Sequence, residues 1–561
     1  MTKNIFKKLK QKKQIELCFF VFLIILVFFL YRQNLKTFFV SDDFDWITSS
    51  QNRNIFSFFI TNYAGKIGGG NYCPMVNLVY FLANKIGGLN PLPYHLFSIF
   101  FHIGNAVLVY LIAKHFFGKK TAAFSALFFA VYFNHSEAVA WASAIPHLGA
   151  GFFFLLGVWL WIKYRSKKFI LYIIGSLLSF LSALLFKEIA LAFPAVLLIL
   201  HIIEKEINFT AKSKNIIKNN LNFLICLFFY LLILVAYLIM RYNTTGVIWG
   251  YYGNKSFGFN LKFYIQNAVK YFVSFFSTNL LRVNLQKTAL NHIRLAIVII
   301  GTIFLGLGIW LRKFFKFYFL SVILFLTVSA IYLPLLMNPL NNEGERYLYL
   351  PSVLFCIFEA FLLVKLLKKY PKILLSVVIL ITLSSSYVLC KKNQIWNLSG
   401  QVSKKIITDF SKIVDINKNG EKIIFLYLPD NIDGAQIFRN AIKEAISLYY
   451  PNYNLDAEVL PIYIMLQKNN WNKNLFAWKS DGENRILGKT SNQEKIITGF
   501  DRRESDNFIF ELWGYDYNYF NTDAIFIKIK NNFLKTAQNQ KTYFLYYNEG
   551  GLQKLDQNLI K

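Results

Sequence analysis

The chain has 561 residues, of which 55% are hydrophobic and 16% are charged, and its formal net charge is +31. Because a soluble domain has roughly 25% charged residues, this composition excludes an ordinary soluble fold. A net charge of this size could indicate nucleic-acid binding, but most basic clusters here stand in short gaps between apolar segments. That arrangement is typical of the cytoplasmic loops of a membrane protein, so we expect no nucleic-acid partner.

The first predicted element is a membrane-spanning helix close to the N-terminus. Basic residues from Lys3 to Lys13 precede an apolar run from Leu17 to Leu30, and no small-residue cleavage motif follows it. A removed signal peptide would need such a motif. We therefore predict a retained signal anchor whose basic end lies in the cytoplasm.

Further apolar segments, close to the roughly 20 residues that a membrane span needs, recur as far as residue 390. About 11 transmembrane helices are predicted, at residues 15–33, 94–117, 120–134, 147–164, 168–186, 188–204, 219–241, 293–311, 316–337, 349–367 and 372–390. The basic gaps between them then all lie in the cytoplasm, as the positive-inside rule requires. Segment 262–281 would break this pattern if it crossed, so we predict an amphipathic or re-entrant element. The loop 34–93 and the tail are then both extracytoplasmic.

Two domains follow from this topology, a transmembrane domain of residues 1–390 and a small soluble α/β domain of residues 391–561. In the second domain we predict a strand at Ile423–Leu428, a helix from Ala435 to Tyr450, and further strands at Phe508–Trp513 and Tyr543–Tyr547. The tail has no cysteine, which excludes disulfides within it. It shows no catalytic motif.

Three carboxylates, Asp42, Asp43 and Asp45, follow the first predicted span directly. A solvated acidic loop is the simplest interpretation. The alternative is a carboxylate that takes the proton of a reacting hydroxyl, which is the task of a general base. Other ionisable residues on the same predicted face favour this alternative.

The next outer loops add a His–Glu pair, His135 and Glu137, and an ion pair, Lys187 and Glu188, where two apolar helices meet. His and Glu at this depth often cap helices or meet lipid headgroups, and a metal site would need three or four converging ligands. A divalent metal ion therefore stays an open hypothesis, with Asp43, His135 and Glu137 as its candidate ligands. Ionisable groups inside a membrane are costly and often functional, although Lys187 could equally extend to the interface.

The last outer loop of the membrane domain contains Glu345, Arg346, Tyr347 and Tyr349. A guanidinium between two tyrosines at the membrane surface can bind a phosphate through two parallel hydrogen bonds. An interfacial anchor would explain the tyrosines but not Glu345. Carboxylates and phosphate-binding cations on one face together indicate transfer chemistry at the outer leaflet.

Several segments resemble the GT-C fold glycosyltransferases, and in particular the transmembrane and tetratricopeptide-repeat O-mannosyltransferases within the protein O-mannosyltransferase group. These segments are Phe39-Val40-Ser41-Asp42-Asp43, Tyr72-Cys73-Pro74-Met75, Tyr94-His95-Leu96, His135-Ser136-Glu137, Phe186-Lys187-Glu188 and Glu345-Arg346-Tyr347-Leu348-Tyr349-Leu350-Pro351-Ser352. The chain differs from that group at Ser41, where an aromatic residue is common, at Phe186, where serine is common, and in lacking its C-terminal repeats.

The resemblance implies that the chain is an enzyme, a hexosyltransferase. It would be an integral protein of a plasma membrane of the bacterial or archaeal type. It would transfer a sugar from a polyprenyl-phosphate donor to a hydroxyl on a protein, glycolipid or glycan acceptor, on the extracytoplasmic face and among membrane lipids. Inversion at the anomeric carbon is expected, because the acceptor hydroxyl would displace the lipid phosphate in a single step and one displacement reverses the configuration. A transporter or flippase, or an enzyme like the O-antigen ligases, is the alternative.

The resemblance also suggests a role for each site residue. Asp42, as the first acidic residue of the family's pair, would be the base, with Asp43 as the second choice. The donor phosphate is expected to contact Arg346, Lys187, Tyr347 and Tyr349. Acceptor-binding or supporting roles are expected for His135, Glu137, Glu188, Glu345 and His95.

Overall fold

The computed structural model describes residues 2–207, 216–248, 267–268, 271, 274–275, 326–329, 343–418, 420–481, 485–490, 496–498, 504, 507–513, 521–522, 524–530, 533, 541–556 and 559. The chain divides into two units. One, here called the helical unit, consists of Met1–Leu35 and Ser49–Asn393. The other, here called the C-terminal unit, consists of Lys36–Thr48 and Gln394–Lys561. Part of the first predicted outer loop therefore groups with the tail.

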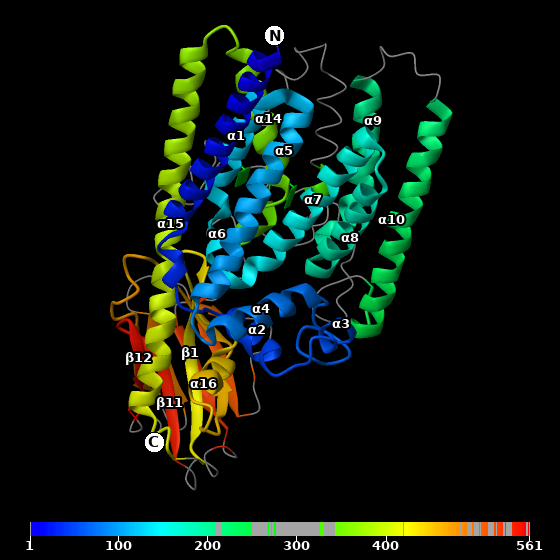
Figure 1. Ribbon diagram of the computed structural model, residues 1–561. Helices are drawn as coiled ribbons and strands as arrows, with labels where there is room; N and C mark the ends of the chain where they lie inside the picture. Colours follow the sequence, from blue (N-terminus) through cyan, green and yellow to red (C-terminus); the bar gives the residue numbers. More distant parts are fainter. Residues whose placement is uncertain are drawn as a thin grey trace. The chain divides into compact units, whose positions relative to one another are not determined.

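Helices make up almost all of the described part of the helical unit (Figure 1). They are α1 (Thr2–Tyr31), α3 (Ser57–Ile60), α4 (Pro74–Gly87), α5 (Leu92–Val131), α6 (Ser136–Ala140), α7 (Ile145–Lys167), α8 (Ile170–Phe186), α9 (Phe193–Ile207), α10 (Ile216–Thr245) and α14 (Pro351–Leu366). Short 3-10 turns stand between them, namely η1 (Asn34–Lys36), η2 (Phe133–His135), η3 (Ala142–Ala144), η4 (Glu188–Ala192) and η7 (Glu345–Leu348). Two helices cross the division between the units, α2 (Asp42–Gln51) and α15 (Pro371–Ile413).

Within the described residues, five helices are long and apolar enough to cross a membrane, which makes this a helical integral membrane protein. These spans are Gln14–Tyr31, Leu92–Val131, Ala142–Lys167, Asn220–Thr245 and Pro371–Ile413. Helix α5 covers two predicted spans, and its backbone leaves the helical conformation at Gly118, between them. The predicted spans 293–311 and 316–337 lie almost wholly outside the described residues, as does most of segment 262–281. The predicted count of spans and their orientation therefore stay predictions.

Close helix contacts in this unit use glycine. A Cβ atom on Gly104 of α5 would meet the Phe152 ring at 2.6 Å, and one on Gly157 of α7 would meet the Phe193 ring at 3.0 Å. Small residues let helix backbones approach, and that close packing holds helices together in lipid, where apolar burial gives little driving force. The large rings thus fill the space that the glycines leave.

The C-terminal unit contains a mixed sheet in the order β12-β11-β1-β4-β7-β9, with β2 and β3 also paired to β1. A second sheet, β5-β6-β10-β8, is antiparallel. The bounds are β1 Lys422–Ile432, β2 Ala435–Gln436, β3 Asp456–Val459, β4 Ile462–Leu466, β5 Phe476–Ser480, β6 Arg485–Thr490, β7 Ile496–Thr498, β8 Phe508–Trp513, β9 Asn521–Thr522, β10 Ala524–Ile529, β11 Thr542–Asn548 and β12 Gly551–Lys554. Strand β1 is buried from Ile423 to Ile432 and is parallel to β3, β4 and β11. Such continuous burial is typical of a central parallel strand.

The predicted helix 435–450 needs a correction. Ala435 and Gln436 form strand β2, which pairs with the end of β1, and the helix, α16, runs only from Ile442 to Tyr449. Ala441, directly before α16, has a φ of 64°, so the chain turns sharply there. The loop Ile437–Ala441 connects β2 to α16.

Residues 38–44 pack against both α15 and the loop Ile437–Ala441. Ser403 of α15 donates to the Phe39 carbonyl at 2.7 Å. A Cβ atom on Gly400 would meet the Phe38 backbone nitrogen at 2.8 Å. The rings of Phe44 and Phe438 stack with centroids 5.7 Å apart. The first acidic segment is thus held inside the C-terminal unit.

Candidate active site

The two adjacent carboxylates of the acidic segment have different surroundings. Asp43 is only 2% exposed, and its Oδ2 accepts the Val40 backbone N–H at 3.0 Å. Asp42 is half-buried, and its Oδ1 accepts a hydrogen bond of 2.7 Å from Asn440 Nδ2. Both begin helix α2, where the positive end of the helix dipole favours carboxylates. Asp43 therefore stabilises its own turn, whereas the Asp42 carboxylate is partly accessible.

Asp45 is the third carboxyl group of this segment. Burial and, to a smaller extent, the nearby carboxyl groups of Glu444 and Asp42 together raise the pKa of Asp45 to about 7. Its Oδ2 also accepts from Asn440 Nδ2 at 3.3 Å. The C-terminal unit thus brings the carboxyl groups of Asp42, Asp45 and Glu444 near one another, and Asn440 donates to the first two.

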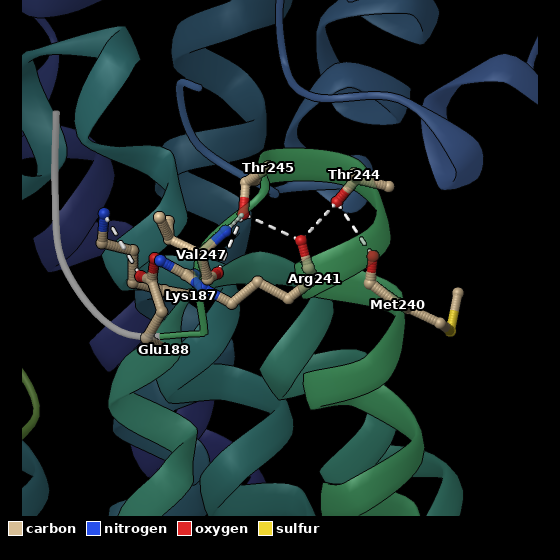
Figure 2. A network of polar contacts seen from close by, with 7 residues as sticks. All are labelled: Lys187, Glu188, Met240, Arg241, Thr244, Thr245 and Val247. Atoms are coloured by element: carbon tan, nitrogen blue, oxygen red, sulfur yellow. Dashed lines mark hydrogen bonds and ion pairs between the residues drawn. The ribbon is translucent and has the colours of Figure 1, made fainter. Parts of the chain in front are cut away.

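A buried charged cluster, here called the cation cluster, joins Lys187, Glu188 and Arg241 in the helical unit (Figure 2). Arg241 donates to Glu188 Oε1 at 2.6 Å, and Lys187 Nζ is 3.6 Å from Glu188 Oε2. Lys187 is 8% exposed and Arg241 is 3% exposed. Two cations thus share the Glu188 carboxylate.

The cation cluster has a rigid frame. Lys187 stands between α8 and η4, and Arg241 lies in the last two turns of α10. Figure 2 shows Thr244 and Thr245 closing the end of α10, where both hydroxyls donate to the Arg241 carbonyl, at 3.0 and 2.8 Å. The glycine-rich part of the outer loop contacts the same end of α10, because Gly68 N–H donates to the Thr244 carbonyl at 2.8 Å.

Glu137 and Arg346 form a second ion pair in the helical unit. Glu137 is 0% exposed, and its carboxylate accepts the Arg346 side chain as well as the backbone N–H groups of Gly344 and Arg346, at 3.3 and 2.7 Å. The guanidinium lies over the Trp141 and Tyr347 rings at 5.1 and 4.6 Å, and also donates to the Tyr347 hydroxyl at 2.9 Å. The Arg346 guanidinium is therefore held by the Glu137 carboxylate, the Tyr347 hydroxyl and two aromatic rings.

Burial and charge oppose each other in this pair. Burial raises the pKa of the Glu137 carboxyl, whereas the Arg346 charge and the two N–H groups lower it. Burial would lower the pKa of the Arg346 guanidinium, but Glu137 holds it above its ordinary value. Each charge thus depends on its partner, as in most buried ion pairs.

Three further predicted residues, Glu345, His135 and His95, are buried in the helical unit. Glu345 accepts from Lys392 Nζ at 2.6 Å, and that ammonium also donates to Asn134 at 2.8 Å. His135 is bonded through Nε2 to Ser352 Oγ at 2.8 Å, and burial lowers its pKa well below the ordinary value. His95 is buried in the first turn of α5.

Tyr349 is also enclosed. Its hydroxyl accepts from Asn105 Nδ2 at 3.1 Å and lies 2.8 Å from His102 Nδ1. Because Asn105 is the donor, the tyrosine proton is left for His102. Both the donor and an acceptor function of the Tyr349 hydroxyl are therefore used within the helix packing.

Among the described residues, no group of three or more His, Cys, Asp or Glu side chains is placed to hold a metal ion. Of the candidate metal ligands, Glu137 forms an ion pair with Arg346, and His135 Nε2 is hydrogen-bonded to Ser352 Oγ. A metal therefore stays a hypothesis, and the chemistry considered below does not require one.

Three functional candidates, Arg241, Lys392 and Asn440, were missed by the sequence analysis. On the predicted topology, Arg241 and Lys392 stand at the outer ends of spans, where the positive-inside rule disfavours cations. That violation was a usable signal of function. No pattern in the sequence pointed to a functional role for Asn440, because it lies 398 residues from Asp42 in the sequence.

No protein-family model matches the chain. In sequence, the chain is similar to the protein O-mannosyl-transferase TMTC2 of Mus musculus and to that of Homo sapiens, each with 36% identity over 99 residues. The matched segment covers 18% of this chain and only 12% of each relative. The predicted resemblance to O-mannosyltransferases is confirmed for that segment, and the chain therefore has glycosyltransferase homologues.

In structure, ArnT from Cupriavidus metallidurans in the apo state matches with a TM-score of 0.43 at 11% identity, over 81% of this chain and 93% of that chain. The same protein bound to undecaprenyl phosphate gives a TM-score of 0.36 at 13% identity, over 80% and 92%. The archaeal oligosaccharyltransferase AglB from Archaeoglobus fulgidus, in complex with an inhibitory peptide and a dolichol-phosphate, gives 0.41 at 11% identity, over 80% and 65%.

Proposed function

We propose that this chain is an integral membrane glycosyltransferase of the GT-C class, which transfers a sugar from a polyprenyl-phosphate donor to an acceptor hydroxyl on the extracytoplasmic face. The observation that carries this proposal is the cation cluster, in which two buried cations share one carboxylate at the ends of apolar helices. Buried cations are costly and are usually held by anionic partners. A bound phosphate would be a further anionic partner for both cations, while the polyprenyl chain stays in lipid.

Arg346 is the third cation of the proposed phosphate site. Lys187 and Arg346 both lie within electrostatic range of His147, whose ring is 5.5 Å from the Tyr347 ring. Three cations, Lys187, Arg241 and Arg346, thus belong to this part of the helical unit, with Glu188 and Glu137 as their ion-pair partners. Because Arg346 keeps donors beyond those given to Glu137 and Tyr347, it can hold a phosphate oxygen without leaving its partner.

Asp42 is proposed as the general base. Its carboxylate takes the proton of the acceptor hydroxyl as the hydroxyl oxygen bonds to the anomeric carbon. The bond from that carbon to the phosphate oxygen breaks, and its electron pair leaves with the phosphate. One displacement inverts the anomeric centre. Asp42 suits this role better than Asp43, because Asp43 is buried and committed to Val40.

Cations suit the leaving phosphate better than a second acid would. A phosphate departs as a stable anion, so no proton has to be delivered to it, and charge-assisted hydrogen bonds stabilise it as its charge grows. The base typically contributes about a hundred- to ten-thousandfold to the rate. In the proposed mechanism Asp42 therefore accepts the proton, and Lys187, Arg241 and Arg346 stabilise the charge of the leaving phosphate.

The phosphate site is tested by Lys187→Gln. This change leaves Glu188 paired with Arg241, so the folded protein should persist. Losing one charge-assisted contact costs about 1.5–3 kcal/mol, which corresponds to roughly ten- to a hundredfold weaker binding of a polyprenyl phosphate. Binding is measured on the purified protein by isothermal titration in detergent.

Lys114→Gln is the matched control, because Lys114 is also a membrane-embedded lysine paired with a carboxylate, Glu16, at 2.8 Å. It should bind the lipid phosphate like the wild type. Equal affinity of the Lys187 variant and the wild type would contradict the assignment. A flippase would bind the same phosphate, but it would not join the sugar to an acceptor.

A further inference from the structure

The side chain of Asn440 connects the tail to the acidic segment of the first outer loop. Its Nδ2 donates to Asp42 Oδ1 at 2.7 Å and to Asp45 Oδ2 at 3.3 Å. Its Oδ1 accepts from Ser41 Oγ at 2.6 Å. One amide group thus contacts three residues of the segment, including the proposed base.

The orientation of this amide is determined by its partners. An ionised carboxylate only accepts hydrogen bonds, so the NH₂ end of Asn440 faces the Asp42 carboxylate, and the oxygen end is left for the Ser41 hydroxyl. Ser41 is itself in an uncommon backbone conformation, with a φ of 46°, and its N–H donates to the Ile437 carbonyl at 2.7 Å. Non-glycine residues hold such a conformation only where the surroundings impose it.

The loop that carries Asn440 is tied to the central strand β1. Ile437 N–H donates to the Asp430 carbonyl at 2.8 Å, and Phe438 N–H donates to the Pro429 carbonyl at 3.1 Å. Arg439 forms a bidentate pair with the Asp430 carboxylate at 2.6 and 2.7 Å. Paired donors of this kind restrict orientation as well as adding energy. Asn440 is therefore presented by a rigid loop.

We propose that Asn440 is a positioning residue, through which the C-terminal domain holds the Asp42 carboxylate in the orientation that accepts the acceptor proton. This inference rests on the proposed role of Asp42 as the base. The carboxamide of Asn440 does not take up a proton at neutral pH, so it acts only through Asp42. A general base must point at the proton it removes, and small misplacements of a catalytic group can cost about a hundredfold in rate.

The test is a double-mutant cycle on the purified full-length protein, with a polyprenyl-phosphate sugar as the donor. Asn440→Ala should lower kcat roughly ten- to a hundredfold and leave the KM for the donor unchanged, because the donor phosphate contacts other residues. In the Asp42→Asn background, where the base is gone, the same change should have no further effect. Ser447→Ala, an exposed residue on α16, should behave like the wild type.

The outcomes separate this inference from the proposed function. If Asp42→Asn turned over at the wild-type rate, the proposed base would be wrong whatever Asn440 did. If Asp42→Asn were impaired and Asn440→Ala stayed within twofold of the wild-type kcat, the positioning role alone would fail. An equal fall in both backgrounds, or a fall that matches lost folded protein by size-exclusion chromatography, would likewise overturn it.

Discussion

Asp45 is a half-buried residue whose neighbours include two further carboxyl groups, those of Glu444 and Asp42. Burial, Glu444 and Asp42 raise its pKa to about 7, compared with about 3.9 for an unfolded Asp. Between these two pH values the folded state keeps a proton that the unfolded state releases. The contribution of Asp45 to stability is thus complete below about pH 4 and falls as the pH rises to about 7.

We therefore expect the unfolding temperature of the wild type to fall between pH 5 and pH 8 by more than that of Asp45→Asn, which lacks this titration. Differential scanning fluorimetry at both pH values measures the difference. Asp409→Asn on α15, where the aspartate pairs with Lys412 at 3.3 Å, is the control. If Asp45→Asn showed the same pH dependence as the wild type, the raised pKa would be excluded.

At the scale of single residues, local signals in the sequence identified some of the charged groups but not their partners. Lys187 and Glu188 were found because an ion pair between two apolar segments is unusual. The partner Arg241 was not found, since it stands at the end of another helix, 53 residues away from Glu188. The different environments of Asp42 and Asp43 could not be predicted, because they arise when the tail folds against the segment.

Gly118 is the point where helix α5 breaks. Its φ of 82° and ψ of 175° belong to a region that only glycine populates readily. No atom lies within 4 Å of a Cβ built there, so a side chain would meet strain in the backbone alone. Gly118→Ala should therefore destabilise the protein by about 1–3 kcal/mol.

The measurement is the unfolding temperature in detergent, compared with Gly151→Ala as the matched control. Gly151 is inside helix α7, and a Cβ there would be 3.4 Å from the nearest atom, which is ordinary contact. Since alanine favours helix over glycine by about 1 kcal/mol, the control should be neutral or stabilising. Equal effects of the two substitutions would show that strain at Gly118 is absent.

At the scale of elements, long apolar runs predicted helices well, because hydrophobic length is a strong signal. The alternating stretch Phe508–Trp513 is strand β8 with the predicted bounds. The helix predicted from Ala435 was wrong at its start, since pairing of Ala435–Gln436 with β1 overrides local propensity.

At the scale of the whole molecule, the proposed base belongs to the C-terminal unit and the proposed phosphate ligands belong to the helical unit. The chain order places the acidic loop with the transmembrane domain, because the loop directly follows the first span. Its contacts with α15 and with the loop Ile437–Ala441 could not be read from the chain order. The C-terminal domain, which has no recognisable motif, thereby acquires a role in the proposed chemistry.

The central claim is that the chain transfers a sugar from a lipid phosphate with inversion, using Asp42 as the base. The most direct measurement is the reaction of purified wild type and Asp42→Asn with a polyprenyl-phosphate hexose and hydroxyl acceptors, with the anomeric configuration of the product determined by NMR. We predict an inverted product from the wild type and a rate about a hundred- to ten-thousandfold lower for Asp42→Asn. A product that retains the donor configuration, or equal rates for the two proteins, would contradict the account.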